Sequence, residues 1–306
     1  MPFALQGVSD EATGWASGWP VGPDGNDNSG MMECGGADAA SPGGMGNDNR
    51  MTQMDFPNIL VCDVGNSRIA MAQACGNEVH NSRREGVCCV AELAAAMKEL
   101  WEGVERPAGI AASSVSPKGL ELLEAAAEQL GQGVLLVGRD LPLPIDTDLP
   151  EPGRIGTDRL CSAAMAWHRL QSACVVAQLG TAITIDCVND DGVFLGGAIL
   201  PGLSMSAEAL SRGTACLPKV SLERPTWVHG RDTREAIVGG LVYGARGALR
   251  ELTEAYATEL GKWPPLVLTG GDAELVGQGY EIVHAIVPDL CLMGVSLAYL
   301  MGKRVK

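Results

Sequence analysis

Three glycine-containing turns at the ends of apolar runs carry residue types that bind nucleotide phosphates. Asp63-Val64-Gly65-Asn66 ends a run that begins at Ile59, and Gly180-Thr181 ends a run that begins at Ala173. Glycine lets backbone N–H groups approach an anion, and a carboxylate such as Asp63 can hold Mg²⁺ beside the phosphates. Thr269-Gly270-Gly271-Asp272 follows a third run, as a loop facing an adenosine would. Ordinary hairpin and strand-to-helix turns use the same residues, so each turn alone leaves a structural role open.

A fourth motif, Gly156-Thr157-Asp158-Arg159, stands at the start of an apolar stretch that we expect to be helical. Asp158 can take a proton from an attacking hydroxyl, and Arg159 can bind an anion through two parallel hydrogen bonds. An acid at an N-cap or in a first helical turn also stabilises the helix by about 1 kcal/mol without any chemistry. Both interpretations of Asp158 stay open at this point.

A fifth motif, Gly196-Gly197-Ala198-Ile199-Leu200-Pro201-Gly202, joins a predicted strand to a predicted helix. Tight turning explains its glycines and proline structurally, and close approach of the backbone to a ligand explains them functionally.

The elements that would position these motifs follow from apolar periodicity and turn residues. We expect strands at 59–64, 67–74, 109–113, 134–137, 173–178, 182–188, 192–200 and 266–268. We expect helices at 90–102, 117–129, 156–170 and 288–301, and either one long helix or a broken pair at 231–260. Residues 140–152, with four prolines, are expected to be a connector, and residues 189–192 a hairpin turn. The turns after Asp63 and Gln178 repeat one strand-turn-strand pattern, which indicates a duplicated unit with two facing hairpins.

Residues 1–57 differ from the rest of the chain. They carry eight acidic residues and one basic residue, and residues 22–49 are rich in Gly, Asn, Asp, Ser and Met without any period. Such a segment buries too little apolar surface to offset its chain entropy, so a disordered tail is expected.

Charge and composition narrow the function class. The formal net charge is −15, whereas nucleic-acid and anionic-membrane binding need a basic surface, so neither partner is expected. No run reaches the roughly 20 apolar residues of a spanning helix, and no signal peptide is evident, so a cytoplasmic location is expected. The ten cysteines show no metal-binding spacing and are expected to be reduced, several of them in the core.

The motifs taken in order resemble the type III pantothenate kinase family, over about residues 59–299. The motifs that carry the resemblance are Asp-Val-Gly-Asn at 63, Gly-Thr-Asp-Arg at 156, Leu-Gly-Thr-Ala-Ile-Thr-Ile-Asp at 179, Gly-Gly-Ala-Ile-Leu-Pro-Gly-Leu at 196, Gly-Arg-Asp-Thr-Arg-Glu-Ala-Ile at 230 and Leu-Thr-Gly-Gly-Asp-Ala at 268. The second and fourth of these in this order are specific to that family.

The resemblance implies an α/β fold of the actin-like ATPase class, with two ribonuclease-H-like domains and ATP in the cleft between them. It places the domains at 58–155 (ATP-binding) and 156–306, after the tail at 1–57. It further implies a homodimer that uses ATP, Mg²⁺ and a monovalent cation (K⁺ or NH₄⁺) to phosphorylate pantothenate.

Site roles follow from the same resemblance. ATP would be bound by Asp63, Val64, Gly65, Asn66, Ser67, Arg68, Gly180 and Thr181, with Mg²⁺ at Asp63. Pantothenate would be bound by Gly156, Thr157, Asp158, Arg159 and Thr233, with Asp158 as the proton acceptor.

Two positions depart from the family pattern. Gln178 stands where the family usually has an aspartate that helps bind the monovalent cation; an amide oxygen can ligate K⁺ but brings no negative charge. Leu149 stands near the position of a tyrosine that many members place against pantothenate, which would keep an apolar wall but lose the hydroxyl.

The sequence therefore predicts ATP-dependent phosphorylation of pantothenate to 4′-phosphopantothenate, the first step of coenzyme A biosynthesis. A regulatory or binding protein that keeps the fold without catalysis is the alternative from another class. A kinase for another hydroxyl compound, such as a sugar, is the alternative enzyme.

Overall fold

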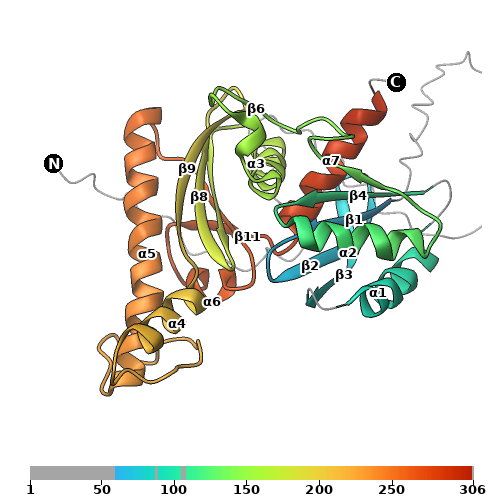
Figure 1. Cartoon of the computed structure of the whole chain (residues 1–306). Coiled ribbons are helices and arrows are strands. Elements are labelled where there is room, and N and C mark those ends of the chain that lie inside the picture. The colour runs from blue at the N-terminus through green and yellow to red at the C-terminus, as the bar shows by residue number, and fades with distance from the viewer. Residues whose placement is uncertain (1–58, 87–88, 105–107, 305–306) are drawn as a thin grey trace, which may run out of the picture. The chain divides into compact units, whose positions relative to one another are not determined.

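The computed structural model describes residues 59–86, 89–104 and 108–304, coloured in Figure 1. The tail predicted at 1–57 lies outside the described residues. The remainder folds around two β-sheets.

The first sheet has the strand order β3-β2-β1-β4-β5. Its strands are β1 (Ile59–Val64), β2 (Arg68–Cys75), β3 (Glu78–Gly86), β4 (Gly109–Ser114) and β5 (Val134–Leu136). Helices α1 (Val90–Glu102) and α2 (Pro117–Glu128) pack on one face, against Leu60, Cys62 and Val64 of β1. Ile59 and Val61 point to the other face and pack against the last helix. A strand buried on both faces needs a continuous apolar run, which is what β1 has.

The second sheet has the order β11-β10-β7-β8-β9-β6. Its strands are β6 (Asp146–Thr147), β7 (Cys174–Leu179), β8 (Ala182–Val188), β9 (Val193–Pro201), β10 (Leu266–Thr269) and β11 (Val283–Ile286). Val175, Ala177 and Leu179 of β7 pack on the face that α5 (Thr233–Leu260) and α6 (Ala273–Gly277) cover. Helix α4 (Leu203–Gly213) follows β9 and contacts α5.

The two sheets share one topology. In the first, β1 pairs antiparallel with β2 and parallel with β4, while β2 pairs with β3 and β4 with β5. In the second, β7 pairs antiparallel with β8 and parallel with β10, while β8 pairs with β9 and β10 with β11. The duplication expected from the sequence is confirmed, and it makes Gln178 the counterpart of Asp63, since each is the fifth residue of its strand.

Two helices lie between the sheets (Figure 1): α3 (Thr157–Leu170) and α7 (Leu290–Arg304). α3 contacts β7 and β8 of the second sheet and β4 of the first, whereas α7 contacts β1, β2 and β4 of the first. They cross so closely that a Cβ on Gly294 would lie 2.0 Å from the carbonyl oxygen of Cys161, so only glycine fits there. Helix α7, near residue 300, therefore covers the sheet that contains β1 and β2.

Most expected elements are confirmed within two residues, and 231–260 is a single helix rather than a broken pair. Its N-cap Asp232 accepts a hydrogen bond from the Glu235 N–H (2.8 Å), and Gly261 ends it with φ of +72°. The elements not expected are β3 and β11. Helix α4 is the helix expected after the fifth motif, and α6 follows the turn at Asp272, where a helix was one of the two alternatives. The expected connector at 140–152 contains the short strand β6.

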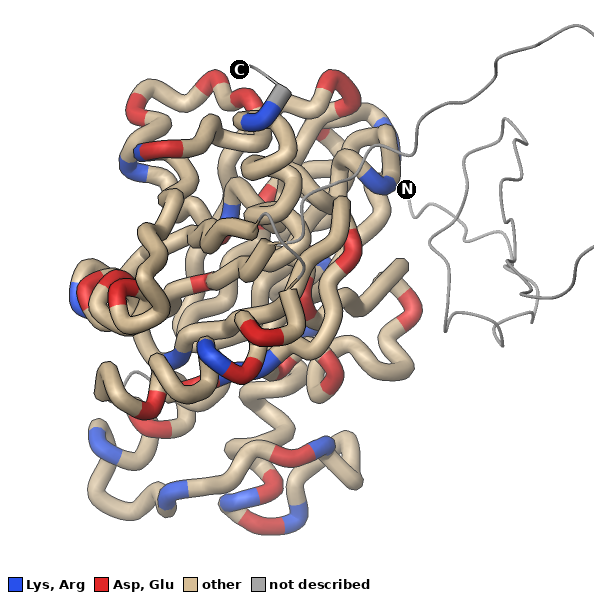
Figure 2. Tube along the Cα trace, turned by 90° about the vertical axis from the view of Figure 1, so that its right-hand side faces the viewer, with Lys and Arg blue, Asp and Glu red and all other residues tan. Residues whose placement is uncertain are grey.

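Other expectations concern single residues. All described cysteines are free thiols, and Cys62, Cys174, Cys187 and Cys291 are buried, as expected. In the described part of the chain, no helix is long and apolar enough to cross a membrane. Acidic and basic residues are interspersed along the trace (Figure 2).

Candidate active site

The first phosphate-loop candidate is the turn between β1 and β2. The Gly65 N–H donates to the Arg68 carbonyl (3.0 Å), which closes the turn, and a Cβ on Gly65 would lie 3.1 Å from the same oxygen. Asn66, Ser67 and Arg68 are exposed, and Val64 is buried beneath them. The turn therefore presents three polar side chains outward from a fixed strand end.

Asp63 lies partly buried at the end of β1. The Ser113 hydroxyl on the adjacent β4 donates to Asp63 Oδ1 (2.6 Å) and fixes that carboxylate. Burial raises the pKa of Asp63, while the hydrogen bond from Ser113 and the charge of Arg84 act against this rise. Ser113 was not expected from the sequence, because its role follows from the parallel pairing of β4 with β1.

The second candidate is the turn between β7 and β8. The Gly180 N–H donates to the Ala182 carbonyl (3.1 Å), and Thr181 is exposed at the tip. Gly202, the last residue of the fifth sequence motif, donates its N–H to the Thr181 carbonyl (3.1 Å), and a Cβ there would lie 2.1 Å from the Gly180 oxygen. Gly202 therefore packs so closely on this loop that no residue with a Cβ would fit at its position.

The third loop contacts the second. The Asp272 N–H donates to the Leu179 carbonyl (3.0 Å), and Gly270 adopts φ of +99° with no space for a Cβ beside Leu179. Asp272 occupies the N-cap position of α6 but makes no side-chain capping bond. Its pKa is raised by burial and lowered by the charge of Arg68 on the first loop.

A hydrogen bond joins the two phosphate-loop candidates: the hydroxyl oxygens of Ser67 and Thr181 are 3.0 Å apart. The structure therefore brings together the two loops that the sequence singled out separately.

Asp158 lies in the first turn of α3, whose N-cap position is Gly156. A Cβ on Gly156 would lie 2.5 Å from Asp158 Oδ1, so glycine is needed for that carboxylate to take its place. Thr157 anchors the helix start to β4 through Ser114, accepting from its N–H (3.1 Å) and donating to its carbonyl (3.2 Å). The motif thus fixes a carboxylate beside the end of the first sheet.

The Asp158 carboxyl has a pKa well above the usual value for an aspartate. Burial, and after it the negative charge of Asp63, raise the pKa of Asp158 to about 6, although the Arg159 N–H (2.8 Å) and guanidinium act against the rise. Gln178 donates from Nε2 to the backbone carbonyl of Asp158 (3.2 Å), which connects α3 to β7. A carboxylate with a pKa near neutrality can act as a general base at physiological pH.

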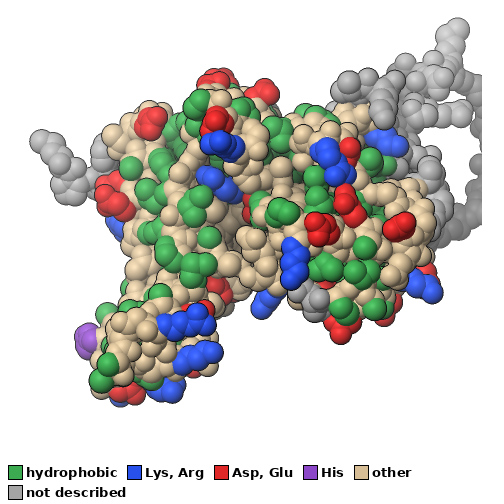
Figure 3. Space-filling model, viewed as in Figure 1, with side chains coloured by type: hydrophobic (Ala, Val, Ile, Leu, Met, Phe, Trp, Pro, Cys, Tyr) green, Lys and Arg blue, Asp and Glu red, His purple; other side chains and the backbone are tan. Residues whose placement is uncertain are grey.

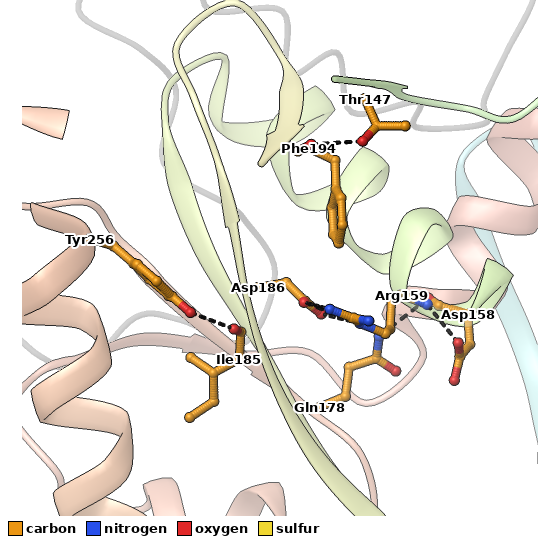
Figure 4. Close-up of polar contacts among 8 residues, drawn as sticks. All are labelled: Thr147, Asp158, Arg159, Gln178, Ile185, Asp186, Phe194 and Tyr256. Atoms are coloured by element: carbon orange, nitrogen blue, oxygen red, sulfur yellow. Dashed lines mark hydrogen bonds and ion pairs between the residues drawn. The ribbon is translucent and has the colours of Figure 1, made fainter. Parts of the chain in front are cut away.

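The Arg159 side chain extends away from Asp158 toward the interior of the second sheet (Figure 4). Its Nε and Nη2 both donate to the fully buried carboxylate of Asp186 on β8. The Phe194 ring lies 5.6 Å from the guanidinium carbon. Asp186 ends the motif that begins at Leu179, but no role was expected for it, although an acid among the apolar residues of a predicted strand is a visible signal.

Thr233 lies apart from this cluster. It is exposed in the first turn of α5, 23 residues before Tyr256. Tyr256 donates to the carbonyl of Ile185, next to Asp186 (3.1 Å). At 1.5 Å per helical residue, Thr233 lies about 35 Å along the helix from that contact.

The donor set fits Mg²⁺. Protein Mg²⁺ sites use one or two carboxylates together with substrate phosphates and water. Asp63 and Asp158 provide two carboxylates close enough to raise the pKa of Asp158, and a divalent cation would relieve that repulsion. Within the described ranges, no group of three or more His, Cys, Asp or Glu could form a metal site by itself.

Comparisons with known proteins agree with this geometry. A family model described as type III pantothenate kinase matches residues 59–255. A type III pantothenate kinase of Dehalococcoides mccartyi is 36% identical over 169 residues, 55% of this chain and 66% of the relative, so the match spans just under two thirds of that relative's length. One of Thermomicrobium roseum is 32% identical over 260 residues, covering 79% of this chain and 96% of the relative.

Solved structures similar in fold include the following one. It is described as a Baf family transcriptional activator from Campylobacter jejuni, with a TM-score of 0.54 and 19% identity, covering 80% of this chain and 99% of that one. This likeness concerns the fold alone.

Proposed function

The chain belongs to the type III pantothenate kinase family, and from that premise we propose that it transfers a phosphoryl group from ATP to the hydroxyl of pantothenate, giving 4′-phosphopantothenate. The carrying observation is the position of Asp158: its carboxylate has a raised pKa and stands in the electrostatic field of Asp63, next to the joined loops. Phosphoryl transfer depends mainly on positioning and electrostatics, and this arrangement provides both.

Each residue has a distinct task in the proposed reaction. Asp158 would accept the proton of the attacking hydroxyl. Asp63 would hold Mg²⁺, which when bound neutralises phosphate charge. Backbone N–H groups around Gly65 and Gly180, with the Thr181 hydroxyl, would orient the phosphate oxygens.

A monovalent cation, K⁺ or NH₄⁺, is part of the proposal in a modified form. Gln178 donates from Nε2 to Asp158, so its amide oxygen remains available, and no described residue donates to it. That oxygen would contribute a dipole where an aspartate would contribute a full charge. We therefore expect weaker cation dependence than an aspartate would give.

We also propose that the enzyme is a cytoplasmic homodimer. Large apolar side chains are exposed on three elements of the second half: Ile199 (64%), Met205 (47%) and Tyr243 (38%). Figure 3 shows apolar side chains gathered over β8 and β9. Since Thr233 lies far from Asp158 of its own chain, it would reach pantothenate only from a second copy.

The direct test is a coupled assay of ADP release from ATP and Mg²⁺, with and without pantothenate and with and without K⁺. Pantothenate-dependent release supports the proposal. Asp158→Ala should lower turnover by about 10²- to 10⁴-fold, the range of general-base catalysis, while its thermal melt still shows a folded protein. No turnover from folded wild-type protein in either salt would instead support the non-catalytic binding protein.

A further inference from the structure

Arg159 uses one edge of its guanidinium for hydrogen bonds to Asp186, and the opposite edge remains available to a ligand. Nε and Nη2 lie on one side of the group, and both donate to Asp186. A guanidinium has five N–H donors, so an edge formed by Nη1 and the second hydrogen of Nη2 remains. No described residue accepts a hydrogen bond from Nη1.

Asp186 is built into the sheet rather than placed there loosely. Its side chain is 0% exposed, and β9 opposite it carries Gly197. A Cβ on Gly197 would lie 2.4 Å from Asp186 Oδ1 and 2.2 Å from the Ile185 carbonyl oxygen. Gly197, the second glycine of the fifth motif, therefore makes room for this carboxylate, a role separate from turning and from ligand approach.

The guanidinium is held from a second side. The Phe194 ring lies 5.6 Å from it, and Thr147 of β6 donates to the Phe194 carbonyl (3.0 Å). Fixing an Arg side chain in one rotamer costs conformational entropy. Because both a buried carboxylate and an aromatic ring hold Arg159, we infer that the orientation of its guanidinium is important for function. Arg159 is 15% exposed, so its remaining edge can still meet a ligand.

We propose that Asp186 is a positioning residue that holds one edge of Arg159 so that the opposite edge binds the carboxylate of pantothenate end-on. This inference rests on the proposed function. The bidentate contact expected for Arg159 would then use Nη1 and Nη2, because the edge formed by Nε and Nη2 is already occupied. Asp158, the next residue, would then face the hydroxyl end of the same substrate.

The substitution Asp186→Asn distinguishes two roles of Asp186. Orienting Arg159 and neutralising its charge predict opposite changes in KM for pantothenate. If Asp186 orients Arg159, the amide brings a competing donor against the guanidinium, so KM for pantothenate should rise about tenfold with a smaller change in kcat. If Asp186 only neutralises Arg159, its removal leaves more positive charge, and KM for the anionic substrate should fall. A fall in KM would overturn the proposal.

A neutral substrate provides the second readout. In the alcohol analogue of pantothenate, CH₂OH replaces the carboxylate. Asp186→Asn should reduce the preference of the wild type for the acid over this alcohol. An equal loss on both substrates would mean a structural role only, and would overturn the inference while leaving the kinase assignment intact. Absence of wild-type turnover on pantothenate would instead remove the proposed function.

Two further variants keep the proposal testable if Asp186→Asn alone fails to fold. Breaking a buried ion pair is destabilising, so Arg159→Gln is compared with Arg159→Gln/Asp186→Asn, in which the pair is neutral. If Asp186 acts through Arg159, the second substitution changes the acid-to-alcohol preference by less than twofold; a further tenfold loss would overturn the proposal. Tyr256→Phe is the matched control, since it removes a hydrogen bond to Ile185 on the same strand without touching Arg159, and it should keep the wild-type preference.

Discussion

Ser67 and Thr181 are 114 residues apart in the chain, yet their hydroxyl oxygens are 3.0 Å apart. Each lies in the turn of an antiparallel hairpin, and the two hairpins are equivalent positions of a duplicated sheet. The duplication therefore places two copies of one turn against each other, which is what a phosphate chain held from two sides requires.

Thr181→Ala should raise KM for ATP several-fold and leave KM for pantothenate nearly unchanged. The hydroxyl is exposed, so its loss should cost little stability, about 0.5–1 kcal/mol at most. Steady-state kinetics with each substrate varied would measure this. Thr258→Ala, an exposed threonine on α5, is the control, and equal effects of the two substitutions would contradict a role in ATP binding.

The pH profile should show the titration of Asp158. Its pKa is raised to about 6 by burial and by Asp63, and a general base works only when deprotonated. We expect kcat/KM for pantothenate to fall as pH decreases through 6, by about tenfold per unit well below it. Activity that stays constant down to pH 5 would exclude Asp158 as the titrating base.

The contribution of Asp158 to folding stability should decrease as pH rises, whereas its contribution to activity should increase. A carboxyl whose pKa rises on folding, from 3.8 to about 6, favours the folded state when protonated. That contribution is complete below pH 3.8 and is lost as pH rises through 6. Asp158→Asn, which stays neutral, should therefore exceed wild type in unfolding free energy above pH 6, by up to about 3 kcal/mol, and match it near pH 4. Urea unfolding at both pH values would decide this, and equal stability at pH 7 would contradict it.

The cation response should depend on residue 178. Gln178→Asp adds a full negative charge at the position equivalent to Asp63, so half-maximal activity should need less K⁺ than in wild type. Titration with KCl at constant ionic strength would measure the difference, with NaCl as the control salt. Identical K⁺ curves would remove Gln178 from any cation site.

Mixing two inactive variants should restore activity if Thr233 acts across a dimer. Asp158→Ala and Thr233→Ala each disable every site in a homodimer, but a mixed dimer has one site with both residues intact. Random exchange of subunits would give about a quarter of wild-type activity. Each variant mixed with itself is the control. No recovery after verified exchange would place Thr233 outside a shared site.

The sequence predicted the phosphate loops and the Asp158 motif because each is local. In Asp63-Val64-Gly65-Asn66 and in Gly156–Arg159, the residues expected to bind ligands are adjacent in the sequence, so their types alone indicate the chemistry. Asp186 and Ser113 were missed because their roles depend on strand register and helix packing, which join them to Arg159 and Asp63 across 27 and 50 residues.

The fold was predictable for similar reasons. Strands such as β1 and β7 are apolar on both faces, and the long apolar periods of α1 and α3 mark helices. β3 was missed because its nine residues are mostly exposed and polar; it forms by pairing with β2 rather than by burial.

The packing of α7 against β1 and β2 has a consequence for synthesis on the ribosome. Leu292, Val295 and Tyr299 of α7 cover one face of the sheet that contains Ile59 and Val61. Those strands are synthesised more than 200 residues before the helix that shields them. A nascent chain must therefore carry an uncovered apolar sheet until α7 has emerged, so termination before α7 would leave that face open to aggregation.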